Sequence, residues 1–147
     1  MTTQPRLPRR AARASRPRWS RHLRYDPIPA LLSSDEPSLS YLARRDLLGE
    51  DPGPAANLWS LPAVERLLRK QRPDGGWSYP GGGIPKHRAT EDYDQIETYR
   101  NLGILIEKYA GTRRLPAVSS AAEFLFSRQT HDGDFRGIYG RQYTPNY

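Results

Sequence analysis

Two aspartates separated by one residue, Asp92 and Asp94, are the strongest candidates for acid–base chemistry in this sequence. Together with Glu91 they form an acidic cluster around Tyr93. A carboxylic acid can act as a general acid only if burial and neighbouring carboxylates keep it protonated. The alternative is structural, because Asp94 followed by Glu97 matches a capping box and acidic groups stabilise the start of a helix. We favour the cap and keep Asp92 and Asp94 as candidate catalytic residues.

Other chemical sites are not indicated by the sequence. The chain has no cysteine, which excludes disulfides and thiolate metal ligands. Its three histidines, His22, His87 and His131, share no metal-ligand spacing. The glycine run at 81–83 has no strand before it and no Lys-Ser/Thr after it, so it is not a phosphate-binding loop. We therefore predict neither a metal nor a cofactor.

A seven-residue motif, Gln-x-x-Asp-Gly-x-aromatic, occurs twice, each time after an apolar helical pattern. The two copies are built from Gln71, Asp74, Gly75 and Trp77, and from Gln129, Asp132, Gly133 and Phe135. The glutamine amide can pair with carbonyls left free at a helix end, Asp-Gly suits the turn, and the ring can cover the glutamine. One repeat cannot bury its own apolar face, so we predict that the motif is structural and joins successive helix pairs.

Start and stop signals predict an all-α fold with no strands, made of about two helical hairpins. The predicted helices span residues 34–49, 60–71, 94–111 and 116–129. Ser34 or Asp35 is expected to cap the first helix, and residues 51–56 are expected to form a linker. The third helix is apolar over most of its circumference, which predicts that it is largely buried.

The formal net charge of +7 comes from the N-terminal end of the chain. Residues 1–24 contain eight arginines and no acid, which leaves residues 25–147 near neutrality. We predict a disordered Arg/Pro-rich tail at 1–28 and one repeat domain at 29–147. The near-neutral domain argues against specific nucleic-acid binding, and no segment has the roughly 18 apolar residues of a membrane span. A cytoplasmic protein is expected, with the tail able to touch anionic surfaces such as a membrane.

The two motifs carry a family resemblance. In the forms Leu67-x-x-x-Gln71-x-x-x-Gly75-x-Trp77 and Leu125-x-x-x-Gln129-x-x-x-Gly133-x-Phe135, they resemble the QW repeats of squalene–hopene cyclases and related terpene cyclases. The same α/α-toroid fold is used by protein prenyltransferase β-subunits. The resemblance implies a ring of helical hairpins around an apolar pocket for isoprenoid chains. About two hairpins are present here, so the chain looks like an N-terminal portion of a toroid, completed by self-association or by a partner chain.

The resemblance also bears on the acidic cluster. Class II terpene cyclases use an Asp-x-Asp-Asp element whose middle acid protonates an alkene or an epoxide. Asp92 and Asp94 match its first two acids, but Gln95 replaces the last. The prenyltransferase zinc site needs a cysteine, which argues against that branch of the superfamily.

Aromatic side chains could line an apolar pocket and, through their ring faces, stabilise cations, although they could equally pack in a core. The candidates are Trp77, Tyr79, Tyr93, Tyr99, Phe135, Tyr139 and Tyr143. The expected function is an apolar-ligand scaffold of the isoprenoid type that is not catalytic alone. Two alternatives stay open: a terpene cyclase or isomerase once the ring is completed, with Asp92 or Asp94 as proton donor, and a helical module for protein interaction.

Overall fold

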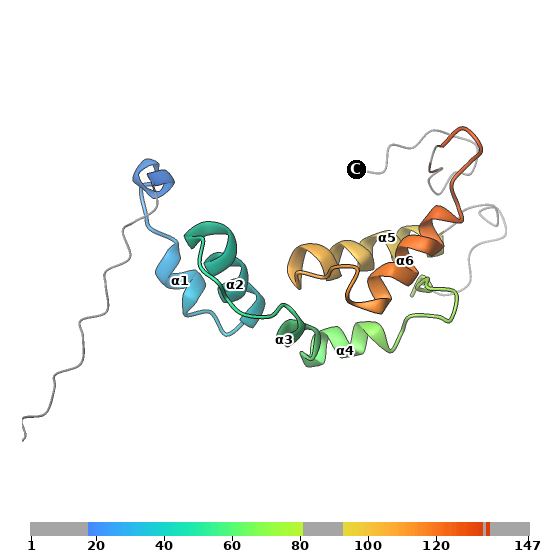
Figure 1. Cartoon of the computed structure of the whole chain (residues 1–147), viewed down its shortest axis with the longest axis horizontal. Coiled ribbons are helices and arrows are strands. Elements are labelled where there is room, and N and C mark those ends of the chain that lie inside the picture. Colours follow the sequence, from blue (N-terminus) through green and yellow to red (C-terminus); the bar gives the residue numbers. More distant parts are fainter. Residues whose placement is uncertain (1–17, 81–92, 134, 136–147) are drawn as a thin grey trace, which may run out of the picture.

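A computed structural model describes residues 18–80, 93–133 and 135 of the chain. These residues form helices joined by short loops (Figure 1), and no strand occurs among them, which confirms the all-α prediction. Each copy of the motif is closed by one isolated antiparallel β-bridge, Gln71 to Trp77 in the first motif and Gln129 to Phe135 in the second. The toroidal arrangement itself stays a prediction.

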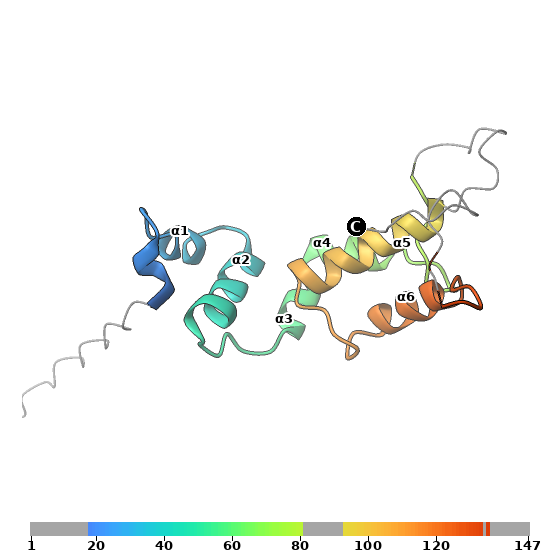
Figure 2. The same cartoon turned by 90° about the horizontal axis from the view of Figure 1, so that it is seen from above.

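The helices fall into two groups along the long axis of the molecule (Figures 1 and 2). The N-terminal group contains η1 (Arg18–His22), α1 (Ile28–Leu32), α2 (Pro37–Leu42) and its π-helical continuation η2 (Ala43–Leu48). The other group contains α3 (Ala56–Trp59), α4 (Pro62–Leu68), α5 (Tyr93–Gly103), its π-helical continuation η4 (Ile104–Lys108) and α6 (Pro116–Phe126). Helices α5 and α6 lie side by side, with α4 next to them.

The N-terminal group corrects two predictions. The predicted tail extends too far, because residues 18–28 include η1 and the start of α1, and the Trp19 indole N–H donates to the Leu47 carbonyl at 3.2 Å. The rest of the tail lies outside the described residues. The cap of α2 is also different: Glu36 is the N-cap, and the Ser34 hydroxyl accepts from the Glu36 N–H at 3.2 Å.

Helix ends follow the expected chemistry elsewhere. Gly49 ends η2 with φ of +65°, a left-handed conformation that glycine adopts without strain. Helices α4 and α6 each begin with a proline after an extended leucine, where the missing N–H of proline would have had no helical partner. The segment predicted as a linker ends one residue earlier, because Ala56 starts the short helix α3.

The hydrophobic core lies among α3, α4, α5 with η4, and α6. Its buried members are Leu58, Val64, Trp77, Leu105, Tyr109, Ala110, Leu115, Ala117, Val118 and Ala121. The Trp59 indole N–H donates to the Tyr109 carbonyl at 3.2 Å, which ties α3 to the end of η4.

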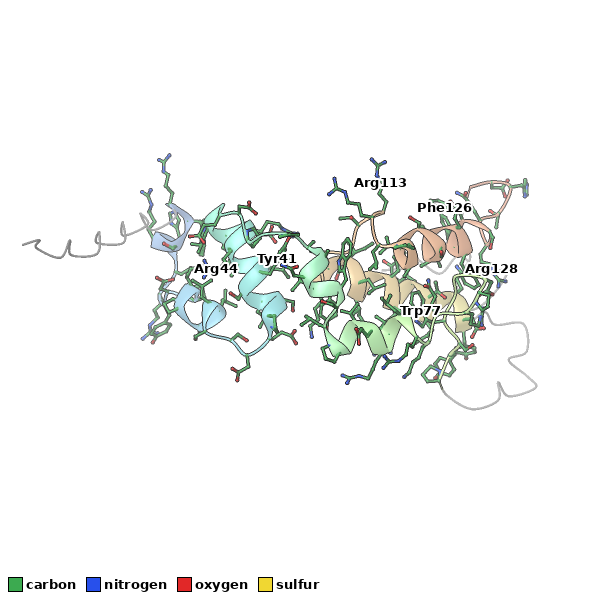
Figure 3. The ribbon with its side chains drawn as sticks, turned by 60° about the horizontal axis from the view of Figure 1, so that its bottom comes forward. Tyr41, Arg44, Trp77, Arg113, Phe126 and Arg128 are labelled. Carbon is green, nitrogen blue, oxygen red and sulfur yellow. The ribbon has the colours of Figure 1, made fainter. Side chains whose placement is uncertain are left out.

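The first motif connects three helices. The Gln71 side-chain N–H₂ donates to the Gly75 carbonyl at 2.8 Å and to the Ala117 carbonyl of α6 at 2.9 Å. The Trp77 indole N–H donates to the Leu67 carbonyl at the end of α4 at 2.9 Å, and its backbone N–H donates to the Thr98 hydroxyl of α5 at 2.9 Å. Trp77 is fully buried and lies between α4 and α5 (Figure 3). The motif therefore holds α4, α5 and α6 together.

The prediction that the third helix is largely buried is wrong. The buried residues of α5 are the polar Gln95, Thr98 and Asn101, whereas Tyr99 is 52% exposed and Ile106 in η4 is 45% exposed. The polar face turns inward because Thr98 is needed as a hydrogen-bond partner of the first motif. The apolar side chains of Ile96 and Leu102 are consequently only half-buried.

The two motif glycines provide a matched test of packing. Both have positive φ, +88° at Gly75 and +83° at Gly133. A Cβ at Gly75 would lie 2.2 Å from the Ser120 carbonyl oxygen of α6, whereas the one described group that a Cβ at Gly133 would meet is the Gln129 side chain, at 3.7 Å.

Gly75→Ala should therefore destabilise the protein more than Gly133→Ala does. Both variants carry left-handed strain of roughly 1–2 kcal/mol, and Gly75→Ala adds an overpacking cost of about 1–3 kcal/mol. Urea denaturation at low protein concentration, followed by circular dichroism, measures the difference. Equal losses in the two variants would contradict the packing of the first motif on α6.

Candidate functional site

An apolar groove between α5 and α6 is the candidate ligand site. Its volume is about 390 Å³, which lies within the range of small-molecule pockets. The lining residues are Gln95, Ile96, Tyr99 and Leu102 of α5, Ala122, Leu125 and Phe126 of α6, and Phe135 of the second motif. On α5 the spacing of these residues places them on one side of the helix, next to the side on which Thr98 faces the first motif.

Aromatic rings form one end of this groove. The rings of Phe126 and Phe135 lie 5.8 Å apart in a tilted arrangement. Phe126 is 58% exposed although it is a large apolar residue on α6 (Figure 3). Such an exposed apolar surface beside a concavity is typical of a binding site.

A second hollow, of about 590 Å³, lies along α5 and η4. Tyr99 and Leu102 contribute to it as well, but its lining also includes Arg100, Glu107 and Lys108. These charged groups would have to lose water to an apolar ligand, so the α5–α6 groove is the better candidate.

The aromatic residues predicted to line a pocket are distributed over several places. Tyr99 lines the groove, whereas Trp77 is enclosed in the core. Tyr79 and Tyr93 pack on each other outside the groove, with ring centroids 5.0 Å apart. Tyr139 and Tyr143 lie outside the described residues.

Of the two candidate catalytic residues, Asp92 lies outside the described residues and Asp94 lies inside α5. Asp94 is not the N-cap that the sequence suggested. Its carboxylate pairs with the Arg72 guanidinium and accepts from the Tyr79 backbone N–H at 2.9 Å. Asp94 therefore connects the chain after α4 to the first turn of α5.

The surroundings of Asp94 favour its ionised form. Burial raises the pKa of this carboxyl, but the Tyr79 N–H and the Arg72 guanidinium outweigh that effect and hold the pKa below its usual value. A general acid needs the opposite shift. The arrangement around Asp94 is that of a structural anion.

Arg72 is an important residue that the sequence analysis did not single out. Its guanidinium contacts Asp74 as well as Asp94, and it lies over the Phe124 ring with 5.5 Å to the ring centroid. The two carboxylates raise the pKa of Arg72, since each stabilises its charged form. Arg72 thus adds an ionic connection to the hydrogen bonds of the first motif.

The second motif repeats the turn of the first in a more exposed position. The Gln129 side chain donates to the Gly133 carbonyl at 2.8 Å, as Gln71 does to Gly75. Gln129 and Gly133 are exposed, and within the described part of the chain no helix packs on them.

A second, shorter repeat in the sequence marks the starts of two helices. The tetrapeptide Leu-Pro-Ala-Val occurs at residues 61–64 and again at 115–118, where it starts α4 and α6. The residues that line the groove on α5 and α6 could also have been found, from their spacing of three and four. Among the described residues no group of three acidic or histidine side chains is placed to hold a metal ion.

Comparisons with protein-family models, with curated proteins and with solved structures find no match. The resemblance to terpene cyclases thus rests on the two motifs alone. No helix in the described ranges has both the length and the apolar character to cross a bilayer.

The Arg72–Asp94 pair predicts a pH dependence of stability. The folded pKa of Asp94 is lowered from 3.8, so its stabilising contribution is complete above the unfolded pKa and is lost as the pH falls through the folded value. Asp94→Asn should lower stability by about 1 kcal/mol at neutral pH, a value reduced by solvent screening, and should flatten the loss of stability below about pH 4.

Thermal denaturation between neutral and acidic pH measures this effect. Asp35→Asn, at an exposed carboxylate in the loop before α2, is the control and should keep the wild-type pH profile. An unchanged acid limb in Asp94→Asn would show that Arg72 and Asp94 do not form a stabilising pair.

Proposed function

We propose that this chain is a partial α/α-toroid module whose α5–α6 groove binds an apolar, isoprenoid-type ligand. The observation that carries the proposal is the groove itself, in which apolar side chains of two helices and the second motif surround about 390 Å³. Such a site stabilises a ligand mainly by removing apolar surface from water, by about 25 cal/mol for each Å² buried.

A scaffold explains the site residues better than an enzyme does. Catalysis of the cyclase kind requires a protonated acid near the ligand, whereas Asp94 is held as a carboxylate by Arg72 and the Tyr79 N–H. Gln95 and Tyr99 carry the polar side-chain groups among the described groove-lining residues, and neither an amide nor a phenol is acidic enough to protonate an alkene. Binding without chemistry is the function that these groups support.

The open shape of the groove suggests that the ligand is an extended chain. The rings of Phe126 and Phe135 belong to the lining of the groove, and Tyr99 and Leu102 line both the groove and the second hollow. An extended branched chain could follow this path along α5 while making contacts with α6 at one end. Farnesol and geranylgeraniol, which differ only in chain length, are suitable probes.

Titration of farnesol into protein with ¹³C-labelled methyl groups tests the proposal. The methyl signals of Ile96, Leu102 and Leu125 should move in a saturable manner, while those of Ile28 in α1 stay in place. Geranylgeraniol should additionally shift Ile106, which lines the second hollow.

Ala122→Phe should fill the groove and weaken farnesol binding by about tenfold or more, equivalent to roughly 1.4 kcal/mol. Ala30→Phe, which introduces the same ring at an exposed position of α1, is the matched control and should leave the affinity unchanged. Unsaturable shifts, or equal binding to Ala122→Phe and to the wild type, would refute the ligand site.

A further inference from the structure

The first motif and α6 form a contact that can be described as a socket and its insert. Gln71 donates to the Ala117 carbonyl at 2.9 Å, and the bare Cα of Gly75 lies against the Ser120 carbonyl. Ala117 is only 9% exposed as a result. We call the first motif the socket. The insert is the N-cap and the first five residues of α6, which are residues 115–120 with the sequence Leu-Pro-Ala-Val-Ser-Ser.

Helix α4 begins with the same tetrapeptide as this insert. Residues 61–64 repeat 115–118, and the two leading leucines are both extended, with φ/ψ of −66°/140° at Leu61 and −90°/110° at Leu115. A proline occupies the first helical turn in both cases. The two segments differ in their surroundings, because Ala63 is exposed whereas Ala117 is buried. The face of α4 that carries Ala63 and Arg66 thus has the same helix start as the insert, but it is exposed among the described residues.

The second motif is a socket without an insert in the described part of the chain. Its turn has the geometry of the first: the glutamine-to-carbonyl distance is 2.8 Å in both motifs, and Gly133 has φ of +83° against +88° at Gly75. No described residue fills above Gly133 the space that α6 fills above Gly75.

We propose that the second motif of one copy of this chain binds the Ala63–Arg66 face of α4 in a second copy. The contact would reproduce between chains the contact that the first motif makes with α6 within the chain, with Gln129 donating to the Ala63 carbonyl. Each chain carries one socket and one insert at different places, so the association is head-to-tail and can extend or close into a ring.

Charge complementarity favours this occupant. In the alignment of the two tetrapeptides, Arg66 takes the place of Ser120, which lies against Gly75 in the first motif. Arg66 of the second copy would therefore lie beside Gly133 and its neighbour Asp132. Asp132 has a 56% exposed side chain, so its carboxylate is available to a guanidinium in addition to its contact with His131. The arginine and aspartate can form an ion pair, which the uncharged Ser120 cannot form with Asp74.

Two one-sided variants of the full chain test the proposal. Ala63→Trp blocks the insert at an exposed position, and Gly133→Asn blocks the socket with a residue that tolerates positive φ. Circular dichroism checks that both remain folded. Ala30→Trp, on an exposed position of α1, is the control for a surface tryptophan.

Sedimentation velocity from micromolar to millimolar protein gives the readout. The wild type and Ala30→Trp should gain average mass with concentration, while Ala63→Trp and Gly133→Asn each stay at the mass of one chain. An equimolar mixture of these two variants should form a dimer and nothing larger, because it contains one intact socket and one intact insert.

The charge pair gives an independent check. Arg66→Glu and Asp132→Arg should each weaken association by about tenfold or more, as expected for a close interfacial ion pair, and their combination in one chain should restore it. A wild type that stays at the mass of one chain overturns the proposal. So do unimpaired association of Ala63→Trp or of Gly133→Asn, and a mixture of the two that stays at the mass of one chain.

Discussion

The hydrogen bonding at the end of α4 is the constraint on which the rest of the structure depends. A helix of seven residues lacks regular helical partners for its last carbonyls, and here the Leu67 and Leu68 carbonyls accept instead from the Lys70 and Gln71 backbone N–H groups at 3.1 and 3.0 Å. The Leu67 carbonyl accepts in addition from the Trp77 indole N–H, and the Gln71 side chain donates to the Ala117 carbonyl of α6. Short helices become stable here because side chains of the following turn complete their hydrogen bonding and at the same time fill the core.

The same requirement determines the orientation of α5. Thr98 accepts from the backbone N–H of Trp77 and donates to the Asp94 carbonyl, and this exchange is possible only if the polar side of α5 faces the first motif. The Arg72–Asp94 pair fixes the same orientation at the first turn of the helix. Hydrogen-bond satisfaction therefore outweighs burial of the apolar side, and the apolar residues left over form the wall of the groove.

The proposed ligand binding and the proposed self-association would each depend on a different copy of the repeated motif. The groove lies between α5 and α6, where the first motif has fixed both helices, and it needs only the chain described here. The association surface involves the second motif, whose turn is formed but whose partner is missing within the described residues. Repeat proteins commonly show this pattern, in which each unit offers its neighbour the surface that it received from the previous one.

Local sequence was sufficient for the all-α class, for the stop at Gly49 and for the recognition of two equivalent turns, because capping chemistry and glycine conformations depend on neighbouring residues. It failed for the capping role of Asp94, for the end of the tail and for the extent to which α5 is buried. Asp94 looked like a cap or an acid until Arg72, far away in the chain, was brought next to it. Trp19 orders residues that composition alone assigned to a tail, because its indole reaches the Leu47 carbonyl. Which side of an amphipathic helix is buried, and which ionic form a carboxyl prefers, depend on partners that only the tertiary structure supplies.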